Sequence, residues 1–274
     1  MNYKSNAGFI LLPILFLFLC SCSSVPISNR KQLALIPSSQ INSMSFNSYK
    51  EFLSSNKLSS DREKTRMVKR VGRNIQKAVE EYFAQNNMSH KISGYEWEFN
   101  LIEEDTVNAW CMPGGKVVVY TGILPITRDE AGLAVVMGHE VAHAIANHGN
   151  ERMSQGLIVQ MGGVALSKAL EEKPEETKTL FLSSFGLGSQ VGVLLPFSRL
   201  HESEADHLGL IFMAMAGYDP REAADFWQRM ADMKSGGSPP EFLSTHPSDQ
   251  TRINNIKALL PEAMEYYKQA MDQN

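Results

Sequence analysis

Residues 127–149 read TRDEAGLAVVMGHEVAHAIANHG, and this stretch decides the fold. Thr127 and Glu130 have the spacing of a capping box, in which two side chains satisfy the first amides of a helix. The mostly apolar residues that follow continue the helical pattern to Asn147, and Gly149 is placed as its C-terminal stop. We therefore predict one buried helix across this stretch.

The helix carries the pattern of a metal site. His139 and His143 are four residues apart, so their imidazoles lie on one helix face and can reach a single zinc ion. Glu140 can take a proton from a water that the metal activates. Such a site hydrolyses peptide bonds. An amphipathic helix with two surface histidines is the alternative, but the neighbouring residues are small or apolar, so these polar groups need buried partners.

A catalytic zinc takes three protein ligands, so a third must come from elsewhere. The segment RLHESEAD at 199–206 offers Glu202 and Asp206 four apart on one helix face. Glu202 can bind the metal while Asp206 orients a ligand histidine. Glu171 and Glu172 are less suitable because they lie in a charged stretch. A solvated surface pair is the alternative for residues 202 and 206.

The rest of the chain predicts an α+β fold that is predominantly α. Residues 61–86 have apolar positions at helical spacing, and residues 95–102 alternate as a half-buried strand does. A Pro-Gly-Gly turn at 113–115 precedes the β-branched run 116–120, and the chain after residue 122 is helical almost throughout. We predict a small sheet placed before the metal-binding helix.

Composition and charge narrow the function classes. The chain has 274 residues, of which 43% are hydrophobic and 20% charged, as in a soluble globular protein. The net charge is −4 and no cluster of Lys and Arg is present. We therefore expect no nucleic acid as a partner.

The N-terminus has the features of a targeting segment. Lys4 precedes an apolar run, residues 9–19, that is too short for a membrane span. The run ends in Leu-Cys-Ser-Cys, which resembles a bacterial lipoprotein signal in which Cys22 is acylated. An uncleaved anchor or a plain secretory signal is the alternative. We predict a signal peptide at 1–21, a lipidated tether at 22–45 that is rich in Ser, Asn and Pro, and one domain at 46–274.

Several motifs together resemble a known zinc peptidase family, which includes the CAAX prenyl endopeptidases, HtpX and the mitochondrial Oma-type proteases. The matching segments, spread over roughly residues 60–260, are His139 to His143, Glu202-Ser203-Glu204-Ala205-Asp206, Asn108-Ala109-Trp110, Pro113-Gly114-Gly115 and Thr245-His246-Pro247. The cysteine motif points to its bacterial periplasmic lipoprotein branch. The resemblance implies a zincin-like domain that binds one Zn²⁺ through His139, His143 and Glu202. It also implies that Asp206 does not bind the metal but orients a ligand histidine.

The resemblance also gives roles to two further segments. It implies that an extended substrate binds an edge strand, here Val117, Val118, Val119 and Tyr120, through main-chain hydrogen bonds. A purely structural hairpin is the alternative. It places His246 near the metal, where the ring can stabilise the transition state or fill the open coordination position and switch the enzyme off. A surface loop histidine is the alternative.

The function we expect is a zinc endopeptidase that hydrolyses misfolded or unassembled proteins of the bacterial cell envelope. Ser23 after the acylated cysteine implies, by the same resemblance, the periplasmic face of the outer membrane. A periplasmic chaperone or assembly factor that holds clients in the same cleft is the main alternative. A structural zinc site fits poorly, because four Cys or His ligands usually close such sites. Residues 179–198 carry no charge, and we expect a lid or core segment over the cleft in preference to a membrane span.

Overall fold

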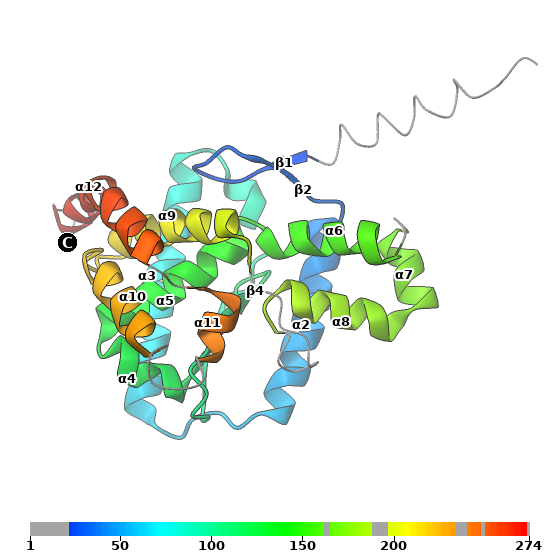
Figure 1. Ribbon diagram of the computed structural model, residues 1–274, viewed down its shortest axis with the longest axis horizontal. Coiled ribbons are helices and arrows are strands. Elements are labelled where there is room, and N and C mark those ends of the chain that lie inside the picture. Colours follow the sequence, from blue (N-terminus) through cyan, green and yellow to red (C-terminus); the bar gives the residue numbers. More distant parts are fainter. Residues whose placement is uncertain (1–21, 162–164, 188–196, 234–239, 248–249, 273–274) are drawn as a thin grey trace, which may run out of the picture.

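The computed structural model describes residues 22–161, 165–187, 197–233, 240–247 and 250–272 (Figure 1). Helices dominate and a small sheet lies among them, which confirms the predicted α+β class. The α-helices are α2 (Ser38–Ser55), α3 (Arg62–Gln85), α4 (Leu124–Thr127), α5 (Glu130–Ile145), α6 (His148–Met161), α7 (Leu166–Glu172), α8 (Pro174–Ser184), α9 (Arg199–Met215), α10 (Glu222–Asp232), α11 (Glu241–Thr245) and α12 (Gln250–Asp272). Two 3₁₀ turns are η1 (Ser89–Ile92) and η2 (Thr121–Ile123), and the strands are β1 (Cys22–Ser24), β2 (Lys31–Leu33), β3 (Glu98–Ile102), β4 (Ala109–Met112) and β5 (Lys116–Tyr120).

The three-stranded sheet has the order β3-β5-β4. β5 pairs in parallel with β3 and antiparallel with β4, so the prediction of an edge strand at 117–120 is wrong. The reason is the turn at 113–115: Gly114 and Gly115 both take positive φ, which folds β4 back onto one side of β5 and leaves the other side for β3. An isolated bridge from Leu58 covers part of the outer side of β3. In the part of the chain that the structure describes, β3 and β4 are therefore the two edge strands of this sheet, and β4 is the one that carries no isolated bridge.

Helix α5 begins and ends differently from the prediction. Thr127 belongs to the short α4, and Arg128 at φ 69° separates that turn from α5. The helix is capped by Asp129, whose carboxylate accepts a 2.9 Å hydrogen bond from the amide of Gly132. It ends before Asn147, which takes the left-handed conformation at φ 60°. The predicted capping box and the glycine stop are both replaced by these residues.

Gly149 has a packing role instead, inside α6. A Cβ atom at this position would lie 2.0 Å from the ring of Phe185. The absence of a side chain therefore lets α8 and its C-terminal turn approach α6 closely.

Helix α5 lies in the middle of the molecule and is buried almost throughout (Figure 1). Helix α9 crosses it where two glycines meet: a Cβ on Gly138 would lie 2.9 Å from the carbonyl oxygen of Gly209. Helices α3, α10 and α12 cover the same body, whereas α6, α7 and α8 extend to the other side in Figure 1. The close crossing of α5 and α9 brings together the two helices that carry the predicted ligands.

Residues 24–45 are not a loose tether, so the predicted domain start at residue 46 is wrong. Val25 and Ile41 are 0% and 1% exposed, and α2 already begins at Ser38. The high content of Ser, Asn and Pro suggested a linker, but the few apolar side chains between them are the ones that pack into the core. The predicted signal peptide at 1–21 lies outside the described residues, as does the side chain of Cys22.

Most of the described residues of the uncharged segment 179–198 are buried. Its first part belongs to α8, and Phe181 is fully buried. Residues 188–196 lie outside the described residues. None of the helices in the described ranges is both long and apolar enough to cross a membrane.

Candidate metal centre

Four buried side chains bring their donor atoms within 4.8 Å of one another, namely those of His139, His143, Glu202 and His246. The first two lie on α5, Glu202 lies in the first turn of α9, and His246 follows α11 directly. Helices that are far apart in the sequence therefore meet around one point. The geometry joins both histidines of the α5 motif with the glutamate expected from α9.

The spacing of these atoms fits a tetrahedral metal. His143 Nε2 lies 3.1 Å from His139 Nε2 and 3.3 Å from Glu202 Oε1. His246 Nδ1 lies 3.2 Å from His139 Nε2 and 3.0 Å from Glu202 Oε1. Bonds of about 2.0–2.1 Å to a tetrahedral zinc place neighbouring donors about 3.3–3.4 Å apart. A set of three imidazole nitrogens and one carboxylate oxygen is one that zinc accepts, so these residues fit the ion.

Glu140 lies beside this set with one oxygen facing it. Its Oε1 is 3.4 Å from His246 Nε2, and it has no hydrogen-bond partner among the described residues. Burial raises the pKa of this carboxyl group above its ordinary value. A buried carboxylate beside a candidate metal site, with one oxygen that accepts no hydrogen bond, is placed to accept a proton there.

Asp206 and Arg252 hold the first histidine and the glutamate in place. Asp206 Oδ1 lies 3.0 Å from His139 Nδ1, which leaves Nε2 of that ring for the metal. Arg252 binds both oxygens of Asp206 at 2.7 and 2.8 Å and reaches Glu202 Oε2 at 2.8 Å. Burial alone would raise the pKa of Asp206, but Arg252 and His139 together outweigh it and hold the pKa below its usual value. Arg252 therefore forms buried ion pairs with both Glu202 and Asp206.

The second histidine has a partner that the sequence did not reveal. His143 Nδ1 lies 3.0 Å from Nδ1 of the fully buried His148, whose Nε2 lies 3.1 Å from Glu204 Oε2. Burial raises the pKa of Glu204, but the hydrogen bonds from His148, Arg30 and Ser28 outweigh it and hold the pKa at about 2. Glu204 is therefore an ionised hydrogen-bond acceptor outside the ligand set.

His201 also has a defined place. Its ring stacks on that of His148 with centroids 4.4 Å apart, and its Nε2 lies 3.1 Å from Glu151 Oε2. No sequence signal assigned a role to His148 or His201. The spacing of five residues from His143 to His148 matches no helix face, because the helix breaks at Asn147 between them.

Two aromatic residues enclose the centre. The ring of Phe197 lies 4.1 Å from that of His143 and stacks on His246 at 5.3 Å. The rings of Trp227 and His139 pack edge to face with centroids 5.5 Å apart. The guanidinium carbon of Arg252 lies 3.4 Å from the ring centroid of Trp227. Phe197 belongs to the segment that we expected over the cleft, and it lies against the ligands.

The edge strand β4 lies next to this centre. Cys111 is on β4, and burial together with the negative charge of Glu140 raises the pKa of its thiol well above the ordinary value. The strand predicted to bind substrate, at 117–120, lies one place further inside the sheet. β4 thus has the position that the sequence analysis assigned to β5.

Comparisons with known proteins agree with the chemistry of this centre. The mitochondrial metalloendopeptidase OMA1 of Schizosaccharomyces pombe is 38% identical over 87% of this chain and 66% of its own length. The OMA1 of Saccharomyces cerevisiae is 36% identical over 65% of this chain and 51% of its own. The beta-barrel assembly-enhancing protease of Escherichia coli is 29% identical over 59% and 34%. The chain thus spans less than two thirds of the length of these relatives. Since the family model Peptidase family M48 matches residues 69–260, which include every residue of the metal centre, the chain belongs to this family.

Proposed function

We propose that this chain is a zinc-dependent endopeptidase. The observation that carries the proposal is the convergence of four donor atoms at 3.0–3.5 Å, with a Glu140 oxygen beside them that accepts no hydrogen bond from the described residues. His139, His143 and Glu202 would hold the ion. A bound zinc ion polarises the scissile carbonyl and acidifies water. Glu140 then accepts the proton from the attacking water and passes it to the leaving amine.

The substrate backbone binds along β4 in this proposal. Asn108 and Tyr120 form a hydrogen-bonded pair, so alternation along the ladder turns the N–H and C=O groups of Ala109 and Cys111 away from β5. The edge of β4 can therefore add an extended peptide, which at Ala109 would replace the hydrogen bond from this amide to Asn108 Oδ1. Main-chain recognition of this kind selects unfolded segments and depends little on their sequence.

His246 acts as a latch on this site. Its Nδ1 lies in the ligand set, at the place that a catalytic zinc site keeps open. The segment that carries it is seated on the same strand edge: the amide of Phe242 donates to the carbonyl of Val107, and Asn108 donates to Glu241. One displacement of α11 would free both the coordination position and the start of β4. A role in stabilising the transition state is the alternative.

The biological setting belongs to the same proposal. We propose a bacterial protein anchored by a lipid on Cys22 at the periplasmic face of the outer membrane, which degrades misfolded or unassembled envelope proteins. The cysteine motif at 19–22 supports the anchor, and the similarity to beta-barrel assembly-enhancing proteases of two bacteria supports the envelope setting. A chaperone or assembly factor that uses the same cleft is the competing function.

The test pairs zinc content with casein cleavage in the full chain and in Glu140→Gln. Glu262→Gln is the matched control, because it makes the same change at an exposed residue outside the metal centre. We expect one zinc per chain in all three proteins and cleavage in all but Glu140→Gln. Equal cleavage by Glu140→Gln would refute its role as base. Zinc without cleavage in the unmodified chain would favour the chaperone function.

A further inference from the structure

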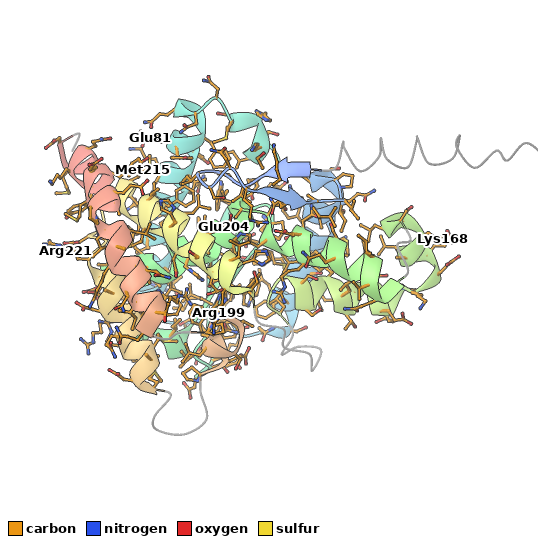
Figure 2. All side chains as sticks on the ribbon, turned by 45° about the horizontal axis from the view of Figure 1, so that its top comes forward. Glu81, Lys168, Arg199, Glu204, Met215 and Arg221 are labelled. Carbon is orange, nitrogen blue, oxygen red and sulfur yellow. The ribbon has the colours of Figure 1, made fainter. Side chains whose placement is uncertain are left out.

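The N-terminal hairpin β1–β2 is attached to the helices that carry the metal ligands. Figure 2 shows Glu204 on the side of α9 that faces this hairpin. Gln32 donates a 2.9 Å hydrogen bond to the carbonyl of Ala146, just after α5, and Asn150 of α6 donates to the carbonyl of Ile36. Val25 is completely buried. The hairpin is thus a fixed part of the domain.

Arg30, in the turn of this hairpin, joins α6 to α9. Its Nε and Nη2 donate to the two oxygens of Glu204, both at 2.9 Å. Its Nη1 and Nη2 donate to the two oxygens of Glu151 at 2.9 and 2.8 Å. Ser28 adds a 2.6 Å hydrogen bond to Glu204. One guanidinium therefore fixes two carboxylates, each with bidentate geometry that a single ammonium group cannot reproduce.

The contacts continue from Glu204 to a metal ligand. His143 has its Nε2 in the ligand set and its Nδ1 against His148. A ring that ligates through Nε2 carries its proton at Nδ1, so His148 Nδ1 must accept that proton in a hydrogen bond. Neutral His148 then has its proton at Nε2, where it can donate only to Glu204. Each contact fixes the next, and the series ends at Arg30.

We propose that Arg30 is a positioning residue for the metal centre, which holds the zinc ligand His143 in one tautomer and ring orientation through Glu204 and His148. The inference rests on the proposed zinc site. It gives the hairpin that directly follows the predicted lipid anchor a part in metal binding. Partners that orient a metal-ligating histidine contribute about 10–100-fold to metal affinity. Arg30 acts one residue further out, so we expect a loss near the lower end of that range.

The experiment measures the zinc Kd by competition with a chelator of known affinity, in the full chain purified in detergent. Arg30→Met keeps the length of the side chain and removes all its donors. Gln32→Ala is the matched control, because it loosens the same hairpin without touching Glu204. We expect a roughly 10-fold weaker zinc Kd in Arg30→Met and an unchanged Kd in Gln32→Ala. A thermal shift of the metal-free proteins reports how far each change destabilises the hairpin.

The results distinguish a failure of the positioning role from a failure of the proposed metal site. An unchanged zinc Kd in Arg30→Met, or an equal weakening in Gln32→Ala, would overturn the positioning role. Absence of zinc from the unmodified chain would refute the proposed metal site instead. If Arg30→Met does not fold, ¹⁵N NMR of the histidines in the unmodified, zinc-loaded chain tests the same series. Protonation of His148 at Nε2 supports the inference, and protonation at Nδ1 overturns it.

Discussion

The crossing of α5 and α9 offers a test of how the ligand spacing is set. In Gly209→Ala, the new Cβ would lie 2.9 Å from the backbone nitrogen of His139 and 3.1 Å from its Cα. Ordinary contacts begin at 3.4 Å, so the helices must separate by about 0.5 Å at this point. Both histidines of the motif lie on α5 and Glu202 lies on α9. The separation therefore opens the ligand set by more than the ~0.2 Å that metal–ligand distances tolerate.

The effect on the stability of the metal-free protein has a comparable size. Overpacking costs about 1–3 kcal/mol, whereas alanine in place of glycine inside a helix recovers up to ~1 kcal/mol. The free energy of unfolding of the metal-free protein should therefore fall by only about 0–2 kcal/mol. Zinc affinity should fall by about 10–100-fold, since a displaced ligand costs as much as the loss of its supporting contacts. Zinc Kd is the more specific measurement, because it depends on the spacing of the ligands whereas the free energy of unfolding does not.

The assay is chelator competition for zinc, with circular dichroism to verify the helical content. Ser203→Ala is the matched control, because it places an alanine on the exposed face of the same helix. We expect the control to bind zinc as the unmodified chain does. A zinc Kd of Gly209→Ala within twofold of the unmodified chain would refute the argument that this crossing sets the ligand spacing.

Three further outcomes are expected. Glu202→Ala should weaken zinc binding by at least about 100-fold, measured by chelator competition, and an unchanged Kd would exclude this residue as a ligand. His246→Ala should keep one zinc per chain and cleave casein faster, because the latch is removed; a loss of cleavage would favour a catalytic role instead. Burial raises the pKa of Glu151, but hydrogen bonds from His201 and Arg30 outweigh it and hold the pKa at about 2. Ionised Glu151 therefore stabilises the fold above its ordinary pKa, and this stabilisation is lost as the pH falls from 4.5 towards 2. Urea unfolding of the metal-free chain should show that the free energy of unfolding falls by on the order of 1–2 kcal/mol over this range. This figure allows for solvent screening, because the side chain of Arg30 is a fifth exposed. The same fall in Glu151→Gln would contradict this account.

The N-terminal segment shows where composition misleads. Its content of Ser, Asn and Pro is that of a linker, and these residues predict a tether. Burial depends instead on a few side chains, such as Val25 and Ile41, and on Arg30 finding two carboxylates more than a hundred residues away. Average composition contains no information on such distant partners.

The sequence by itself determined the local part of the centre. The spacing of His139 and His143 puts both rings on one face of any α-helix. The position of Glu140 relative to these rings is fixed in the same way, because helix geometry depends only on how many residues separate two positions. The pairing of Glu202 and Asp206 on α9 is local in the same sense. The helical spacing of apolar residues in 61–86 was likewise sufficient to predict a helix there, and α3 occupies Arg62–Gln85.

Only the tertiary structure decided how these local parts meet. The strand order puts β4 at the edge, because pairing partners are chosen across the sheet, and a β-branched run such as 116–120 is equally suited to an edge strand and to a central strand. His246 comes to the ligand set from 107 residues beyond His139, and Glu204 reaches His148 across 56 residues. Such contacts depend on which helices pack and at what distance. At the α5–α9 crossing, that distance is set by two glycines whose meeting no local pattern predicts.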